Sequence, residues 1–261
     1  MSALPPIGRG QPLVLIAGPC VIESEEHVHF LAAEIRKIAG PFIFKASFDK
    51  ANRSSLGSYR GPGLKEGTRI LAGLRREGYP ILTDIHDLSQ AEPAAEAADI
   101  LQIPAFLCRQ TDLLIAAGRT GRAVNIKKGQ FVSPHDIRHA AEKVASTGNN
   151  NILLTERGSS FGYNNLVVDM RGLAIMRDFG WPVFFDATHS IQTPGGLGHA
   201  SGGEPQFIPT LARAAVAAGV DGVFVEVHEA PERALSDGPN ALRLDLLSPL
   251  WAKLQAIHGL I

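Results

Sequence analysis

The chain has 261 residues and a formal net charge of −1, with 45% hydrophobic and 20% charged residues. This composition is ordinary for a globular protein, and it lacks the basic excess of a dedicated nucleic-acid binder. Two cysteines, Cys20 and Cys108, are too few for a disulfide framework, which favours a reducing, cytoplasmic setting. The N-terminus lacks the apolar core of a signal peptide, and no apolar run approaches the ~20 residues that span a bilayer. We therefore expect a cytoplasmic protein with neither a nucleic-acid nor a membrane partner.

Eight short apolar runs recur along the chain, and each is followed by a longer stretch with helical spacing. Their interiors are nearly continuous in Val, Ile, Leu and Phe, which is typical of parallel strands buried on both faces. The runs cover residues 13–19, 42–48, 81–86, 100–107, 123–129, 151–158, 182–190 and 222–228. Eight strand–helix cycles predict an α/β fold of the (β/α)8 TIM-barrel type, with a single domain over residues 1–261. An open doubly wound sheet is the alternative, but "AGPC" after the first run is not its Gly-rich phosphate turn.

Three serines mark predicted helix starts between these runs, namely Ser24, Ser89 and Ser133. The third and fourth runs are so close that the helix between them must be short. The last helix is predicted within 241–260 with an interruption near Pro249, because proline removes a hydrogen bond from a helix interior. Two long segments, 189–206 and 228–240, follow the seventh and eighth runs, and we expect them to close over a site or to be disordered.

Polar side chains follow the end of every apolar run. They include Cys20, Lys45, Asp84, His86, Gln102, Lys127, Lys128, Glu156, Arg157, Asp186, His189, Glu226 and His228. The carboxyl ends of barrel strands meet on one face, where barrel enzymes place their active sites. At any single end, a satisfied buried group or a loop residue is the simpler interpretation. Eight ends in succession are hard to explain by packing, because each buried charge costs free energy unless it is paired.

One group among these residues is cationic and consists of Lys45, Lys50, Arg53, Lys128 and Arg157. Arginine offers a planar fork for bidentate contacts and lysine a compact point charge, so the group predicts an anionic ligand carrying phosphates or carboxylates. The alternative is a set of surface salt bridges to neighbouring carboxylates.

A second group consists of Cys20, His189, Glu226 and Asp237. Thiolate, imidazole and carboxylate are common ligands of a divalent transition metal. No short spacing motif supports the set, so a buried Cys20 thiol and a hydrogen-bonded loop His189 remain alternatives. Cys108 is interpreted as a core thiol.

Seven segments of the chain resemble the 3-deoxy-D-manno-octulosonate 8-phosphate synthase family. They are "FKASFDKANRSS" (44–55), "TDIH" (83–86), "QIPAFLCRQTDLL" (102–114), "NIKKGQFVSP" (125–134), "ERGSSFGYNNLVVDMR" (156–171), "DATHSIQTPGG" (186–196) and "SDGPNAL" (236–242). The resemblance implies a (β/α)8 barrel that assembles as a homotetramer. It also implies condensation of phosphoenolpyruvate with D-arabinose 5-phosphate and water, giving phosphate and an eight-carbon sugar acid phosphate for lipopolysaccharide synthesis.

The resemblance also implies roles for individual residues. Lys128 and Arg157 would hold the phosphoenolpyruvate phosphate with Lys45 close by, while Ser47 and Lys50 would face its carboxylate. The arabinose phosphate would be bound by Asn52, Arg53 and Ser54, part of which would reach a neighbouring subunit's site. Gln102 and Phe106 would line the pocket, and Asp84 would lie near the reacting sugar. The candidate catalytic residues are Lys45, Lys50, Asp84, His189 and Asp237.

The family divides into a metal-dependent class and a metal-independent class that carries Asn in place of Cys20. The metal-dependent class uses four ligands, which fall here on Cys20, His189, Glu226 and Asp237. The loop 236–240 resembles the metal-independent class, but we give Cys20 more weight because it would be a ligand. The resemblance thus implies a metal-dependent enzyme with Zn, Fe(II), Mn or Co. The metal would either activate a water or orient the sugar aldehyde, and we favour orientation.

Two alternatives remain at this level. A related family condenses phosphoenolpyruvate with erythrose 4-phosphate to give 3-deoxy-D-arabino-heptulosonate 7-phosphate, but it carries a Lys-Pro-Arg-Thr-type motif in place of "KANRSS" (50–55). The other is a non-catalytic barrel that binds a phosphorylated metabolite, against which the full set of strand-end residues argues.

Overall fold

The computed structural model describes residues 4–52, 55–195 and 202–261. Within these ranges, eight parallel strands pair in the order β1-β2-β3-β4-β5-β6-β9-β12, and β12 pairs again with β1 to close a barrel. The strands are β1 (Val14–Gly18), β2 (Ile43–Lys45), β3 (Ile81–Asp84), β4 (Ile100–Ile103), β5 (Ala123–Lys127), β6 (Ile152–Glu156), β9 (Val183–Asp186) and β12 (Gly222–His228). Each lies within one of the eight predicted runs, so the predicted barrel is confirmed.

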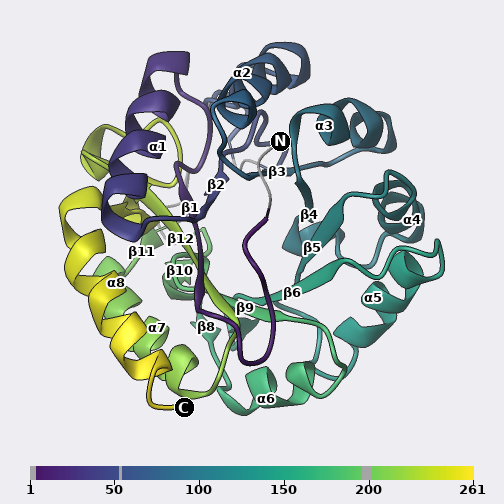
Figure 1. The fold of residues 1–261 in the computed structure, drawn as a ribbon, viewed down its shortest axis with the longest axis vertical. Coiled ribbons are helices and arrows are strands. Elements are labelled where there is room, and N and C mark those ends of the chain that lie inside the picture. Colours follow the sequence, from purple (N-terminus) through teal and green to yellow (C-terminus); the bar gives the residue numbers. More distant parts are fainter. Residues whose placement is uncertain (1–3, 53–54, 196–201) are drawn as a thin grey trace.

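Helices surround the strands on the outside of the barrel (Figure 1). In the described chain they are α1 (Glu25–Ala39), α2 (Leu64–Arg76), α3 (Ala91–Ala97), α4 (Thr111–Arg119), α5 (Ile137–Ala145), α6 (Arg171–Arg177), α7 (Ile208–Ala217) and α8 (Leu244–His258). Helix α1 begins as predicted at Ser24, whose side chain accepts a hydrogen bond from the His27 backbone. Helix α3 has only seven residues, which confirms the short connection predicted between β3 and β4.

Three local predictions about helices are wrong. Helix α5 begins at Ile137 with Asp136 at its cap, so Ser133 lies in the turn before it. Helix α8 is continuous through Pro249, which lies in its second turn. Because proline has no N–H, the helix loses only the hydrogen bond to the Asp245 carbonyl. The apolar face continues past the proline, where Leu250, Trp251 and Leu254 are buried in the core. Ser89 does not begin α3, because it lies inside a short 3-10 turn that Asp87 caps.

Short elements extend the loops at the carboxyl ends of the strands. Antiparallel pairs form between β7 (Ser159–Ser160) and β8 (Leu166–Val167), and between β10 (Gln192–Thr193) and β11 (Gly202–Gly203). After β12, the chain forms two 3-10 turns, Pro231–Arg233 and Gly238–Asn240, before β13 (Leu242–Arg243) pairs with β12. The second long loop is therefore ordered, while part of the first, 196–201, lies outside the described residues.

The barrel interior has two layers that the strand alternation creates. Side chains two residues apart point to the same side of a strand. The apolar layer near the amino ends of the strands consists of Val14, Ile16, Ile43, Leu82, Ile100, Leu153, Phe184 and Phe224. The next residues on the same side form the polar layer: Lys45, Asp84, Gln102, Asn125, Thr155, Asp186 and Glu226. A separate, larger core fills the space between strands and helices.

Gly18 ends β1 because the chain passes very close to β2 at that point. A Cβ atom on Gly18 would lie 2.0 Å from the Lys45 carbonyl oxygen, which no side chain could tolerate. The glycine thereby lets the chain turn over β2 and brings Cys20 to the barrel mouth. No helix of the described ranges is long and apolar enough to cross a membrane.

Candidate active site

A pocket of about 220 Å³ opens above the polar layer, at the carboxyl ends of the strands. Most of its lining is polar, and it draws residues from widely separated parts of the chain. The lining includes Lys45, Lys50, Asn52, Asp84, His86, Gln102, Phe106, Lys127, Gln130, Arg157, His189, Gln192, Glu226 and Asp237. Eight of the predicted strand-end residues line this one pocket: Lys45, Asp84, His86, Gln102, Lys127, Arg157, His189 and Glu226.

Lys45 ties three of the strand ends together. Its buried ammonium donates to the carbonyl oxygens of Pro19 (3.3 Å) and Cys20 (2.8 Å), and to Glu226 Oε1 (2.5 Å). Burial alone would raise the pKa of Glu226, but the charges of Lys45 and His189 outweigh it and hold that pKa far below its usual range. Lys45 therefore fixes the loop that carries Cys20 against an ionised Glu226.

Asp84 and Lys50 form a second buried charge group in the pocket. Asp84 Oδ2 lies 3.1 Å from His86 Nε2, and its Oδ1 has no hydrogen-bond partner among the described residues. Burial opposes ionisation of Asp84, but the charges of Lys50 and His86 bring its pKa well below the ordinary value. Burial likewise opposes the charge on Lys50, yet Cys20, Asp84, Glu226 and Asp237 together raise its pKa. An ionised carboxylate thus faces an ammonium at the pocket floor.

A chain of neutral groups crosses the polar layer between β4 and β6. Asn125 Nδ2 donates to Gln102 Oε1 at 3.0 Å, and Thr155 Oγ1 donates to Asn125 Oδ1 at 2.6 Å. All three side chains are buried. These bonds fix the orientation of the Gln102 amide in the pocket wall.

Lys127 belongs to the pocket, and Lys128 does not. Lys127 continues the inward series of Asn125 on β5, and its ammonium makes a very short contact with Asp186 Oδ2. Lys128 points the other way: its ammonium donates to the carbonyl of Val132 and to Ser159 Oγ, both at 3.0 Å. Lys128, which the resemblance places at the substrate phosphate, therefore does not line the pocket in this structure. The alternation of side chains along β5 is the physical reason.

Burial sets the charge state of Lys127. It lowers the pKa of this ammonium to about 8, although the carboxylate of Asp186 opposes the shift. At neutral pH the group is therefore a cation that holds its proton only loosely. An anion that binds beside this ammonium would raise its pKa and favour the charged form.

Arg157 lines the same pocket as Lys127, and part of its guanidinium has no hydrogen-bond partner among the described residues. Its Nη2 donates to Gln192 Oε1 at 3.1 Å, while its buried Nη1 has no hydrogen-bond partner among the described residues. Burial lowers the pKa of Arg157, and the charges of Asp186 and Glu156 oppose this lowering. A buried donor without a partner is costly, so this edge of the pocket is suited to an anion that would accept from it.

Three of the four predicted metal ligands converge. One ligand atom each from Cys20, Glu226 and Asp237 lies within 4.8 Å of the others. Cys20 Sγ donates to Asp237 Oδ2 at 3.2 Å and also lies 2.7 Å from Ser236 Oγ. His189 Nε2 is 3.8 Å from Glu226 Oε2, a buried oxygen without a hydrogen-bond partner in the described chain.

The chemistry of this group fits a transition metal. Burial raises the pKa of the Cys20 thiol, and the charges of Asp237 and Glu226 raise it further. A metal cation among these ligands would stabilise the thiolate of Cys20, and Glu226 Oε2, which has no hydrogen-bond partner in the described chain, could coordinate it. Asp237 adopts a left-handed backbone (φ 49°) at the start of a 3-10 turn, which is uncommon outside glycine and marks a constrained position.

Asp186 positions His189 for such a role. Asp186 Oδ1 accepts from the backbone N–H groups of Thr188 and His189, and its Oδ2 lies 2.8 Å from His189 Nδ1. A carboxylate on one imidazole nitrogen fixes the ring and directs the other nitrogen to a metal. Here that other nitrogen faces Glu226.

The remaining predicted site residues are placed as follows. Asn52 and Phe106 line the pocket and are exposed at its rim. Ser47 is fully buried, does not line the pocket, and its Oγ has no hydrogen-bond partner among the described side chains and backbone. Arg53 and Ser54 lie outside the described residues. Cys108 is fully buried in the core, as predicted.

Gln130 and Gln192 line the pocket but were not predicted from the sequence. Lys127 and His86 in the pocket, and Asp186 outside its lining, were named only as strand-end polar residues without a role. The signal for Lys127 was available in the pattern Val-Asn-Ile-Lys, because Val124 and Ile126 pack on the outer core and leave Asn125 and Lys127 inside. Asp186 was marked by its spacing of three residues from His189. Gln130 lies in a loop and Gln192 in the two-residue strand β10, and neither position carries a signal in a single sequence.

Comparison with known proteins identifies the class to which this barrel and pocket belong. A model of the DAHP synthetase I family matches residues 5–257, so the chain belongs to that family.

Within it, the chain is similar to proteins named 2-dehydro-3-deoxyphosphooctonate aldolase. The one from Citrifermentans bemidjiense is 58% identical over 98% of this chain and 95% of its own length. That from Pelobacter propionicus is 59% identical over 98% and 96%, and that from Desulfatibacillum aliphaticivorans is 60% identical over 97% and 94%.

Proposed function

We propose that this protein is a synthase that condenses phosphoenolpyruvate with D-arabinose 5-phosphate and water. The products are 3-deoxy-D-manno-octulosonate 8-phosphate, a precursor for lipopolysaccharide, and inorganic phosphate. A bond forms between C3 of phosphoenolpyruvate and the sugar aldehyde carbon, whose oxygen becomes a hydroxyl. Water supplies the new oxygen at C2 as phosphate leaves.

The observation that carries this proposal is the likeness, over nearly the whole chain, to proteins named for the phosphooctonate. The family model takes its name from the heptulosonate reaction, so the family alone leaves the sugar open. The relatives therefore favour the five-carbon acceptor over erythrose 4-phosphate.

The cations of the pocket support binding of two phosphorylated substrates. We assign the phosphate of phosphoenolpyruvate to Lys127 and Arg157, because both line the pocket and Arg157 Nη1 needs an acceptor. Lys50 would attract the carboxylate. Fixed cations of this kind stabilise charge as it shifts during the reaction, and they need no reorganisation.

The sugar would enter above Asp84, His86 and Asn52. Asp84 Oδ1 is a buried acceptor without a described partner, so it suits a sugar hydroxyl. Gln102, held by Asn125, offers an oriented amide to the same substrate. Phe106 would cover the mouth of the pocket and exclude water from it.

We also propose that the enzyme belongs to the metal-dependent class, with Cys20, His189, Glu226 and Asp237 holding Zn, Fe(II), Mn or Co. When bound, the metal would orient the sugar aldehyde and hold the site in shape. Lys45 keeps the Cys20 loop and Glu226 together in either state. Asp186 keeps the ring of His189 in its orientation.

The proposal extends to a cytoplasmic homotetramer. Exposed aromatic side chains on the mouth loops, Phe131, Phe161 and Tyr163, support a contact with another copy. Such a contact would bring the segment with Arg53 and Ser54 to the site of a neighbour. Sedimentation equilibrium should give four chains per particle, and a monomer would contradict this extension.

Phosphate release tests the proposed reaction. Purified protein with added divalent metal should release phosphate from phosphoenolpyruvate with arabinose 5-phosphate, and mass spectrometry should identify the eight-carbon product. Faster turnover with erythrose 4-phosphate would contradict the proposed use of arabinose 5-phosphate and favour the heptulosonate reaction. If no phosphate were released with any aldose phosphate, the alternative of a non-catalytic barrel that binds a phosphorylated metabolite would remain.

Chelation tests the metal class. Exhaustive EDTA treatment should abolish activity, and Mn, Co or Zn should restore it. Cys20→Asn should keep some activity without metal, while Cys20→Ala and His189→Ala should lose most of theirs. Unchanged activity after complete chelation, verified by metal analysis, would refute the metal-dependent assignment.

A further inference from the structure

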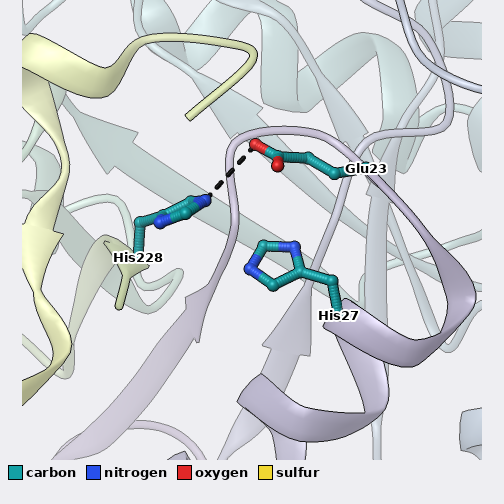
Figure 2. Close-up of side chains that lie close together, drawn as sticks. All are labelled: Glu23, His27 and His228. Carbon is teal, nitrogen blue, oxygen red and sulfur yellow. Dashed lines mark ion pairs between the residues drawn. The ribbon is translucent and has the colours of Figure 1, made fainter. Parts of the chain in front are cut away.

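A second cluster of side chains that could ligate a metal lies between α1, the loop after β1 and the end of β12. Glu23, His27 and His228 each place one ligand atom within 4.8 Å of the other two. Figure 2 shows the two imidazole rings and the carboxylate facing a common space, with His27 on α1 and His228 at the end of β12. The residues do not line the candidate active-site pocket.

The donor atoms of this cluster are held in place by the surrounding backbone. The Nδ1 atom of His228 accepts from the Ala230 N–H at 2.9 Å and also lies 3.3 Å from Glu229 Oε2. Binding of a metal at Nε2 would move the ring proton to Nδ1, which would then donate to Glu229 in place of accepting from Ala230. Oε1 of Glu23 accepts from the Leu235 N–H at 2.8 Å. His27 is anchored through Nε2, which lies 2.9 Å from Glu229 Oε2.

Two buried nitrogens in the cluster lack hydrogen-bond partners in the described chain, and they point to a ligand. They are His27 Nδ1 and His228 Nε2. The His228 side chain is only 6% exposed, and its Nε2 lies 3.4 Å from Glu23 Oε1. Tetrahedral zinc with bonds of about 2.0–2.1 Å sets its ligand atoms about 3.4 Å apart, so this pair already has that separation.

We propose that Glu23, His27 and His228 form a second divalent transition-metal site, separate from the Cys20 site. Two imidazoles and a carboxylate are a common zinc set, and a water would complete the coordination. Glu229, which contacts both histidines, orients their rings from outside the site. Side-chain exposures of 17% at Glu23 and 12% at His27 leave an approach for the ion.

The position of the site gives it a structural role. Glu23 lies three residues after Cys20, and His228 lies two residues after Glu226. A metal here would join α1 to the loop after β1 and to the end of β12. It would therefore stabilise the segments that carry ligands of the proposed active-site metal, without touching the substrate pocket.

Cobalt(II) binding separates the two sites, because only the Cys20 site contains a thiolate. We expect the wild-type protein, stripped and titrated with Co²⁺ alone, to bind two ions per chain. One ion gives thiolate-to-cobalt charge-transfer absorption, and the other gives only ligand-field bands. His27→Leu and Glu23→Gln should each lose the second ion and keep the charge-transfer band, and Glu229→Gln should weaken the second site about tenfold.

His29→Leu is the matched control, since His29 lies on the same helix and pairs with Glu77 outside the cluster. It should bind both ions. Cys20→Ser should lose the charge-transfer band and retain the thiolate-free ion. A wild type with the thiolate-free ion but no charge-transfer band would contradict only the proposed active-site metal. Circular dichroism checks the fold of each variant, and Glu23→Gln preserves side-chain volume. Equal thiolate-free Co²⁺ in wild type and both cluster variants, or none in wild type, would overturn the proposal.

Discussion

The two layers of the barrel interior lie on the same strands but have opposite chemistry. The apolar layer contains Leu153 and Phe184, and two residues further along β6 and β9 the polar layer contains Thr155 and Asp186. Both layers are buried, so exposure does not separate them. The difference is that the polar layer is held by hydrogen bonds and ion pairs and leaves two described oxygens, Asp84 Oδ1 and Glu226 Oε2, without a hydrogen-bond partner that a ligand would supply.

Along the same strands, the apolar layer contributes to stability and the polar layer provides groups for binding. The apolar layer packs without polar cost and holds the strands together. The polar layer costs free energy unless its charges are paired, and here most of them are. Changes in the first layer should therefore affect unfolding, and changes in the second should affect substrate use.

The largest expected effect is at Lys127. Lys127→Met should lower kcat/KM for phosphoenolpyruvate about 10³-fold, roughly 4 kcal/mol, because it removes a buried cation from the pocket. Lys128→Met is the matched neighbour and removes an equally buried lysine that faces the outer core. Steady-state phosphate release measures both. A greater loss in Lys128→Met would restore that residue to the substrate and contradict the inward position of Lys127.

Leu153→Ala probes the apolar layer. It should lower the free energy of unfolding by about 3 kcal/mol, because it opens a cavity that rigid strands cannot close. Denaturant unfolding measures the loss, and kcat/KM of the folded fraction at low temperature should change less than threefold. A large fall in kcat/KM with little loss of stability would show that the two layers do not divide these roles.

The pH dependence of substrate use probes the polar layer more gently. With its pKa lowered to about 8 by burial, Lys127 is charged below that pH and neutral above it. We therefore expect kcat/KM for phosphoenolpyruvate to fall about tenfold per unit above pH 8. Lys127→Arg should move this alkaline limb upward, since arginine keeps its proton. An unmoved limb would assign the titration to another group.

The smallest expected effect lies outside both layers, at the cap of α1. Ser24→Ala should lower the free energy of unfolding by about 1 kcal/mol, because the His27 N–H loses its side-chain acceptor. Thermal unfolding measures this change, and Ser24→Asp should recover most of it. A loss of phosphate release in Ser24→Ala would instead link the cap to the nearby Cys20 loop.

Much of the fold was predictable because buried parallel strands leave apolar runs that need no knowledge of the partner strand. Which residue of Lys127 and Lys128 faces inward was harder, since both sides of such a strand are buried. The inner and outer faces could be distinguished only by taking Asn125 as an inward polar residue. Proximity of Cys20 and Asp237 was beyond local pattern, because 217 positions separate them and barrel closure brings them together. The same closure hid the cluster of His27 and His228.

A crystal structure with bound phosphoenolpyruvate tests the central claim most directly. We predict its phosphate within hydrogen-bond distance of Lys127 Nζ and Arg157 Nη1, directly above the polar layer. A phosphate held by Lys128, or one outside the pocket that these side chains line, would contradict the account.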